Sequence, residues 1–376
     1  MKKKVIQGGC LALAGILFLL FLFFFQGKEK TKLLETEGRN FVKAEVLQVI
    51  EDNETENGNY VGSQRVELLI LSGTHEGEKL EAESSSGYLY GAHCEVGMKV
   101  TAIVSEAEGT VTASVYSIHR EPRIWLMVAI FVLVVCIVGG KKGLASIGGL
   151  LFTLVCIVFL FLPMIYRGIS PILAAIVVVA VTTVVTMIFI DGFSRKSVAA
   201  ILGTVSGVIV AGGFAWLFGQ VADINGYNVS DVENLVYIEG MTDIQVGQLL
   251  FAGILIAASG AVMDVGMSIA STLNELKEKN PMMTSGELFR SGMNVGRDMM
   301  GTMSNTLILA FTGGSINTLV FIYAYNYPYR QIINMYSVGI ELMQGLSSSM
   351  GVILTVPFTS LIAAIFLAEK SKVKSP

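Results

Sequence analysis

The sequence predicts a mainly α-helical membrane protein with about eight transmembrane helices and one small all-β domain. Three observations predict this fold. Hydrophobic residues make up 53% of the 376 residues, and the mean hydropathy of +0.64 is too high for a soluble protein. The apolar residues lie in long runs, and one region after the first run instead alternates like β-strands.

Eight apolar runs are long enough to be membrane helices, because a bilayer core about 30 Å thick needs roughly 20 helical residues. They cover residues 5–25, 124–138, 144–164, 171–190, 198–218, 246–265, 299–323 and 346–367. The first run lacks a small-residue cleavage pattern, so we interpret it as an uncleaved anchor. The predicted domains are therefore the anchor (1–27), a β domain (28–123) and a seven-helix transmembrane domain (124–376).

The orientation follows from the basic residues, since short cytoplasmic loops collect Lys and Arg. Fourteen of the 26 Lys and Arg residues lie on the cytoplasmic side when both termini are cytoplasmic. Residues 28–123 are then extracytoplasmic. The outer side would carry twelve basic and 23 acidic residues, a charge that could enrich cations near a pore.

The β domain should contain five short strands, and Met98, Val100, Ala102 and Val104 should share one face. The predicted strands are 41–50, 64–71, 77–83, 98–104 and 110–118. Five strands in about 80 residues suggest an OB-like barrel. Residues 28–123 hold ten basic and seventeen acidic residues, which argues against nucleic-acid binding. A stabilising module or a binding site for an envelope protein is the expected role.

A polar stripe follows the helix predicted near residues 296–314. At about 100° per residue, Asp298, Thr302, Asn305 and Thr312 fall within roughly 80° of one another. An Asn or Asp side chain facing lipid costs several kcal/mol, so we expect the stripe to face protein or water.

The preceding helix carries a second stripe with Asp264, Ser268 and Ser271 on one face. We expect the two stripes to line one polar vestibule, with Arg297 as the nearest partner for Asp264. Two structural explanations remain open. Asp264 can simply contact Arg297 or Asn305, and Asp298 can be stabilised by the dipole of its own helix.

Between these stripes, residues 284–287 have the spacing of a capping box and predict a cytoplasmic linker helix near 282–297. Gly203 and Gly207 form a GxxxG pattern, which predicts close helix packing. Asp191 could add to an acidic cluster at the same membrane level.

The sequence lacks HExxH, P-loop, CxxC and GxSxG motifs. We therefore expect no enzyme, no catalytic residues, no cofactor and no metal site. A pair of membrane aspartates acting as a protease is the one enzymatic alternative, and Asp264 lacks the glycine-flanked setting for it.

Three segments, 259–276, 286–314 and 64–83, resemble the YibE/F-like family of bacterial multi-pass membrane proteins. The resemblance implies a location in the bacterial cell membrane, and it assigns neither a substrate nor catalytic residues.

Two functions remain open. The first is a permease or channel-like protein that moves a small solute or cation past Asp264, Ser268, Ser271, Arg297, Asp298, Thr302 and Asn305. The second is a non-transporting envelope scaffold whose β domain binds a partner. The expected partners are the lipid bilayer and, depending on the function, a small solute or cation or an envelope protein, with no nucleic acid; the sequence leaves the oligomeric state open.

Overall fold

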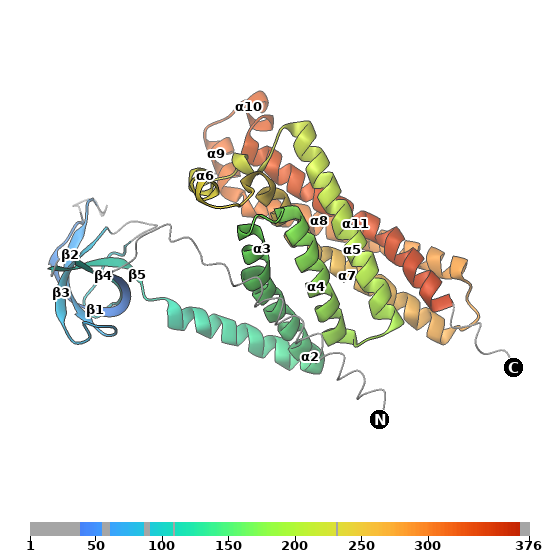
Figure 1. The fold of residues 1–376 in the computed structure, drawn as a ribbon, viewed down its shortest axis with the longest axis horizontal. Helices are drawn as coiled ribbons and strands as arrows, with labels where there is room; N and C mark the ends of the chain where they lie inside the picture. The colour runs from blue at the N-terminus through green and yellow to red at the C-terminus, as the bar shows by residue number, and fades with distance from the viewer. Residues whose placement is uncertain (1–37, 55–60, 86–90, 108–109, 231, 369–376) are drawn as a thin grey trace. The chain divides into compact units, whose positions relative to one another are not determined.

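A computed structural model describes residues 38–54, 61–85, 91–107, 110–230 and 232–368 (Figure 1). The predicted first span, residues 5–25, lies outside the described residues. The chain divides into two compact units, and the boundary falls near Val138 inside one helix. Each unit has its own core and is described by itself.

The first unit contains a closed five-stranded barrel in the order β1-β2-β3-β5-β4. Its strands are β1 (Arg39–Glu51), β2 (Gln64–Ile70), β3 (Lys79–Ser84), β4 (Lys99–Ala107) and β5 (Thr110–Ile118). All neighbours are antiparallel except β3 and β5, which pair in parallel. This crossover agrees with the expected OB-like barrel.

The barrel core consists of the inward residues that alternate along each strand. On β2, Val66, Leu68 and Ile70 are fully buried. On β4, Val100 and Ala102 are also fully buried, which confirms the predicted inward face of that strand. The observed strands begin and end within a few residues of the predicted ones because two-residue alternation is a local signal.

Five helical segments of the described chain are long and apolar enough to cross a membrane. They comprise Glu121–Tyr166, α4 (Pro171–Asp191), α5 (Arg195–Ala222), Val246–Lys279, which contains α7 (Leu249–Lys279), and α11 (Tyr336–Ala368). A sixth is α8 (Ser285–Gly314) together with α9 (Ile316–Ala324), if this pair, bent by 63°, counts as one span. Two short helices, α6 (Val232–Met241) and α10 (Tyr329–Ile333), lie in the connections.

The first of these segments combines α2 (Glu121–Cys156), a π-helical turn and α3 (Leu162–Tyr166). Its helix is interrupted at Gly140, where φ is 53° and ψ is −132°. This left-handed backbone suits glycine because glycine has no Cβ. The interruption lies where the sequence predicts one span to end and the next to begin.

The turn between α7 and α8 differs in one respect from the expected linker. Thr284 and Glu287 form the predicted capping box. Instead of a separate linker helix near 282–297, these residues form the first turns of α8, which continues to Gly314. Lys277 stabilises the turn by donating to the carbonyls of Pro281 and Met283 at 2.8 and 2.7 Å.

In the second unit, α11 packs against α5, α7 and α8, and its apolar segment is half-buried, as is that of α5. Glycines allow this close approach. A Cβ atom at Gly203 would lie 1.9 Å from Thr359 Oγ1, and one at Gly207 would lie 1.7 Å from Thr355 Oγ1. The GxxxG pattern of α5 therefore serves helix packing, as predicted.

Candidate functional site

The residues predicted to form the vestibule lie on the surface of the protomer. Asp264 on α7 and Arg297, Asp298, Thr302 and Asn305 on α8 are exposed. The other two, Ser268 and Ser271 on α7, are partly buried.

The structure does not bring these seven residues together by direct polar contacts. Within the described residues, no hydrogen bond or ion pair joins two of their side chains, and Asp264 contacts neither Arg297 nor Asn305 in this way. The buried side of α8 is the opposite one, with Leu288, Gly292 and Gly296. Within the described residues, α7 and α8 therefore do not enclose the polar vestibule that the sequence predicted.

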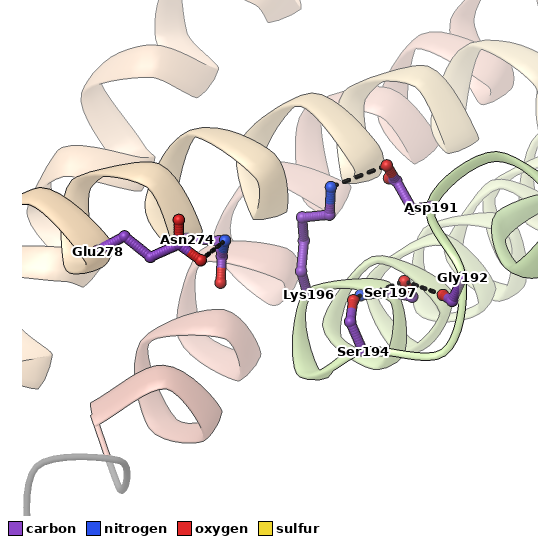
Figure 2. A network of polar contacts seen from close by, with 7 residues as sticks. All are labelled: Asp191, Gly192, Ser194, Lys196, Ser197, Asn274 and Glu278. Carbon is purple, nitrogen blue, oxygen red and sulfur yellow. Dashed lines mark hydrogen bonds and ion pairs between the residues drawn. The ribbon is translucent and has the colours of Figure 1, made fainter. Parts of the chain in front are cut away.

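Asp191 is also not a free member of an acidic cluster. Its Oδ1 lies 2.9 Å from Lys196 Nζ across the turn between α4 and α5 (Figure 2). In the same turn, Ser194 caps α5 by accepting from the Ser197 N–H, and the Ser197 hydroxyl donates to the Gly192 carbonyl at 2.7 Å. These contacts give Asp191 a structural role at the start of α5.

A longer polar row lies on α11, in the core of the bundle. Glu341, Ser348, Thr355 and Thr359 are spaced seven, seven and four residues apart, so they fall within about 40° of one another on the helix. We call these four residues the α11 stripe. Ser348, Thr355 and Thr359 are completely buried. The stripe is about 27 Å long at 1.5 Å per residue, close to the thickness of a bilayer core.

Glu341 is the acidic end of the stripe. It accepts a hydrogen bond from the hydroxyl of Ser315, the residue at the bend between α8 and α9. Its second carboxylate oxygen, Oε2, is buried and has no hydrogen-bond partner among the described residues. An ionisable side chain inside a membrane helix is costly unless it has a partner or a function.

Hydroxyl groups continue the polar row from Ser348 to Thr359. Thr355 satisfies its hydroxyl by donating to the Gly351 carbonyl at 2.7 Å. In the part of the chain that the structure describes, Ser348, Thr359 and the facing Thr204 of α5 have buried hydroxyls without such a bond. A Cβ atom at Gly266 of α7 would lie 2.8 Å from Thr204 Oγ1 and 3.6 Å from Thr359 Oγ1. Three helices thus meet around unsatisfied hydroxyls.

Pro357 lies between Thr355 and Thr359 in the sequence, on the side of α11 away from the stripe. Proline has no N–H, so the carbonyl of Ile353, four residues earlier, loses its usual helical partner. An additional acceptor is therefore available near the centre of α11. The usual substitutes for such a lost bond in a membrane are hydroxyl side chains and ordered water.

The α11 stripe is not visible in the pattern of apolar runs. The last such run starts at residue 346 and excludes Glu341. The observed helix begins at Tyr336. Winding residues 336–360 at about 100° per residue would have aligned Glu341 with the three hydroxyl residues.

Among the described residues, one group of side chains could hold a metal ion, although the sequence predicted no metal site. The ligand atoms of Asp52, Glu54 and His93 lie within 4.8 Å of one another. Gln64 donates to Asp52 Oδ1 at 3.0 Å, and this bond is the largest cause of the lowered pKa of Asp52. Both carboxylates are exposed, so an ordinary solvated cluster explains the arrangement equally well.

Comparison with known proteins gives one family. The model of the YibE/F-like protein matches residues 127–369, more than half of the chain. The matched region includes α4, α5, α7, α8 and α11 and excludes the barrel strands. No curated protein and no solved structure matches the chain. The chain belongs to the YibE/F-like family, as predicted from the sequence; of the three segments that resemble the family, 259–276 and 286–314 lie in the matched region and 64–83 lies outside it.

Proposed function

We propose that the protein is a permease or channel-like transporter in which a small polar solute or cation passes along the α11 stripe. The alignment of one carboxylate and three buried hydroxyl residues along the core of the bundle carries this proposal. Such a row would destabilise a dry, purely structural core, because each unsatisfied buried hydroxyl costs about 1–3 kcal/mol. Water or a polar solute would satisfy these groups.

A cation suits the acidic end of the route better than an anion. The Glu341 carboxylate keeps one buried oxygen for a further partner, and the hydroxyl oxygens of the α11 stripe follow it along the helix. Oxygen ligands of this kind are those that hard cations prefer. The route within one protomer uses none of the seven residues predicted on α7 and α8.

The proposed topology has eight spans, with both termini in the cytoplasm and the barrel outside a bacterial cell membrane. Glu121–Tyr166 has 46 residues, or about 69 Å of helix, roughly twice what one span needs. Division at Gly140 would make two spans of it. The bent pair of α8 and α9 and the apolar run at 5–25 would supply two more.

Transport by purified protein in liposomes tests the proposal. We expect uptake of radioactive sodium or rubidium, or osmotic swelling with glycerol, to exceed that of empty liposomes. Glu341→Gln and Thr359→Val should each reduce the flux at least ten-fold while the protein stays folded. Glu275→Gln is the matched control, because Glu275 is exposed and pairs with Lys279.

The envelope scaffold remains the second candidate, since the close glycine packing of α5 and α11 suits a rigid support as well as a transporter. Absence of flux for ions and glycerol, together with thermal destabilisation by Glu341→Gln, would favour the scaffold. Loss of flux at an unchanged melting temperature would favour transport.

A further inference from the structure

One face of α8 presents polar residues to the outside of the protomer. Asp298, Gly301 and Asn305 follow one another at steps of three and four residues, so they share this face, and all three are exposed. The apolar run that forms the membrane part of the helix begins at Met299. Asn305 lies about 9 Å further along the helix axis, inside that run.

The polar residues on this face differ in whether their side chains are hydrogen-bonded within the helix. Those that are can face lipid, and those that are not cannot. Thr302 and Thr312 donate their hydroxyls to carbonyls of their own helix at 2.9 and 2.7 Å. The Asn305 carboxamide has no hydrogen bond among the described residues, and Arg297 and Asp298 form no ion pair there. A carboxamide has two donors and an acceptor that lipid cannot satisfy. Asn305 therefore requires a partner from outside the described residues.

The face also has room for another helix. A Cβ atom at Gly301 would meet nothing within 4 Å. On the buried side of the same helix, a Cβ atom at Gly296 would lie 2.1 Å from Val356 Cγ1. Gly301 lies one turn before Asn305, and a small residue at that spacing allows a second helix to approach the polar group closely.

We propose that a second copy of this chain covers this face, so that α8 pairs with α8 of the copy. A two-fold axis along the membrane normal places each residue at the depth of its own counterpart. Each carboxamide of Asn305 then meets an identical one, and an amide pair can both donate and accept. The neighbouring Arg297 and Asp298 have opposite charges at one depth, so each arginine meets the aspartate of the other copy.

The exposed side of α5 differs from this face of α8 in its polarity. The exposed side of α5 carries Ile209, Gly213 and Leu217, with no carboxamide or charge among them. Gly213 has open space around its Cα, as Gly301 does. The two glycines therefore form a matched pair that differs in the polarity of the surrounding face.

Cysteine cross-linking of the full chain in its membrane tests the pairing directly. In a variant without native cysteines, Asn305→Cys should form a disulfide-linked dimer of the chain on mild oxidation, and Ile209→Cys should not. A product that stays monomeric, or that links only to another protein or to a cysteine placed in residues 5–25, would overturn the proposal.

A second measurement removes the dependence on the reactive thiol. In liposomes, Gly301→Leu should raise the dimer dissociation constant at least ten-fold, measured by fluorescence energy transfer between labelled copies. Gly213→Leu should leave it unchanged. Equal effects of both variants, or of neither, would refute pairing through α8. This inference depends on α8 alone, so it can fail while transport along α11 is confirmed, and the reverse also holds.

Discussion

Gly207→Ala should destabilise the bundle, because α5 and α11 touch at this position. The new Cβ atom would lie 1.7 Å from Thr355 Oγ1 and 2.8 Å from Val262 Cγ1, whereas ordinary contacts begin at 3.4 Å. The Thr355 hydroxyl would have to rotate away and break its bond to the Gly351 carbonyl.

The expected loss combines three contributions. Overpacking of a tight core costs about 1–3 kcal/mol, and the broken hydrogen bond costs about 0.5–1.5 kcal/mol. The better helix propensity of alanine returns up to about 1 kcal/mol. The net destabilisation is therefore about 0.5–4.5 kcal/mol. Gly213→Ala in the same helix has the propensity gain without the clash, so it should be neutral or stabilising.

Thermal unfolding in one detergent at one scan rate measures the difference between the two variants. The propensity gain is common to both variants, so they should differ by about 1.5–4.5 kcal/mol. At roughly 2–4 °C per kcal/mol, Gly207→Ala should melt about 3–18 °C below Gly213→Ala. Adding Thr355→Ala removes the nearest clashing atom and should recover part of the loss. Equal melting temperatures for the two alanine variants would refute the close contact between α5 and α11.

Three further predictions concern the barrel and the turn between α4 and α5. Gln64→Leu should cost the barrel about 1–3 kcal/mol, measured by hydrogen exchange, because the buried Gln64 accepts from the Cys94 N–H at 2.7 Å. The pKa of Asp52 is lowered from 3.8 in the folded state, so its stabilising contribution is complete above that pH and is lost as the pH falls through the folded pKa. Asp52→Asn should remove this part of the acid sensitivity of barrel exchange. Lys196→Met leaves the largely buried Asp191 carboxylate unpaired and should cost about 1–3 kcal/mol of thermal stability, whereas Lys279→Met, in an exposed pair, should cost under about 0.5 kcal/mol.

The barrel was predictable because its information is local. Two-residue alternation places Val66, Leu68 and Ile70 on one face whichever strand pairs with them. The helices α4 and α5 were predicted almost as well, since both are apolar along most of their length. The start of α11 was not, because Ser337, Glu341 and Gln344 lower the hydropathy of its first turns.

Periodicity detected the stripe of α8 but could not determine what the stripe faces. A helical period separates one side of a helix from the other. It does not identify which side meets protein, because in lipid an apolar side can be buried as readily as a polar one. In α8 the side with Gly292 and Gly296 packs on α11, and that leaves Asp298 and Asn305 exposed.

The glycines of neighbouring helices distinguish an internal polar stripe from an external one. The hydroxyls of α11 lie against glycine positions of other helices, as Thr359 does at Gly203 and Thr355 at Gly207. The glycine beside Asn305, Gly301, belongs to the same helix and faces open space. A glycine on a neighbouring helix leaves space in the core for a polar side chain. A glycine on the same helix as the polar side chain, with open space beside it, allows the backbone of another helix to approach. That distinction depends on which helices are neighbours, so no single helix sequence contains it.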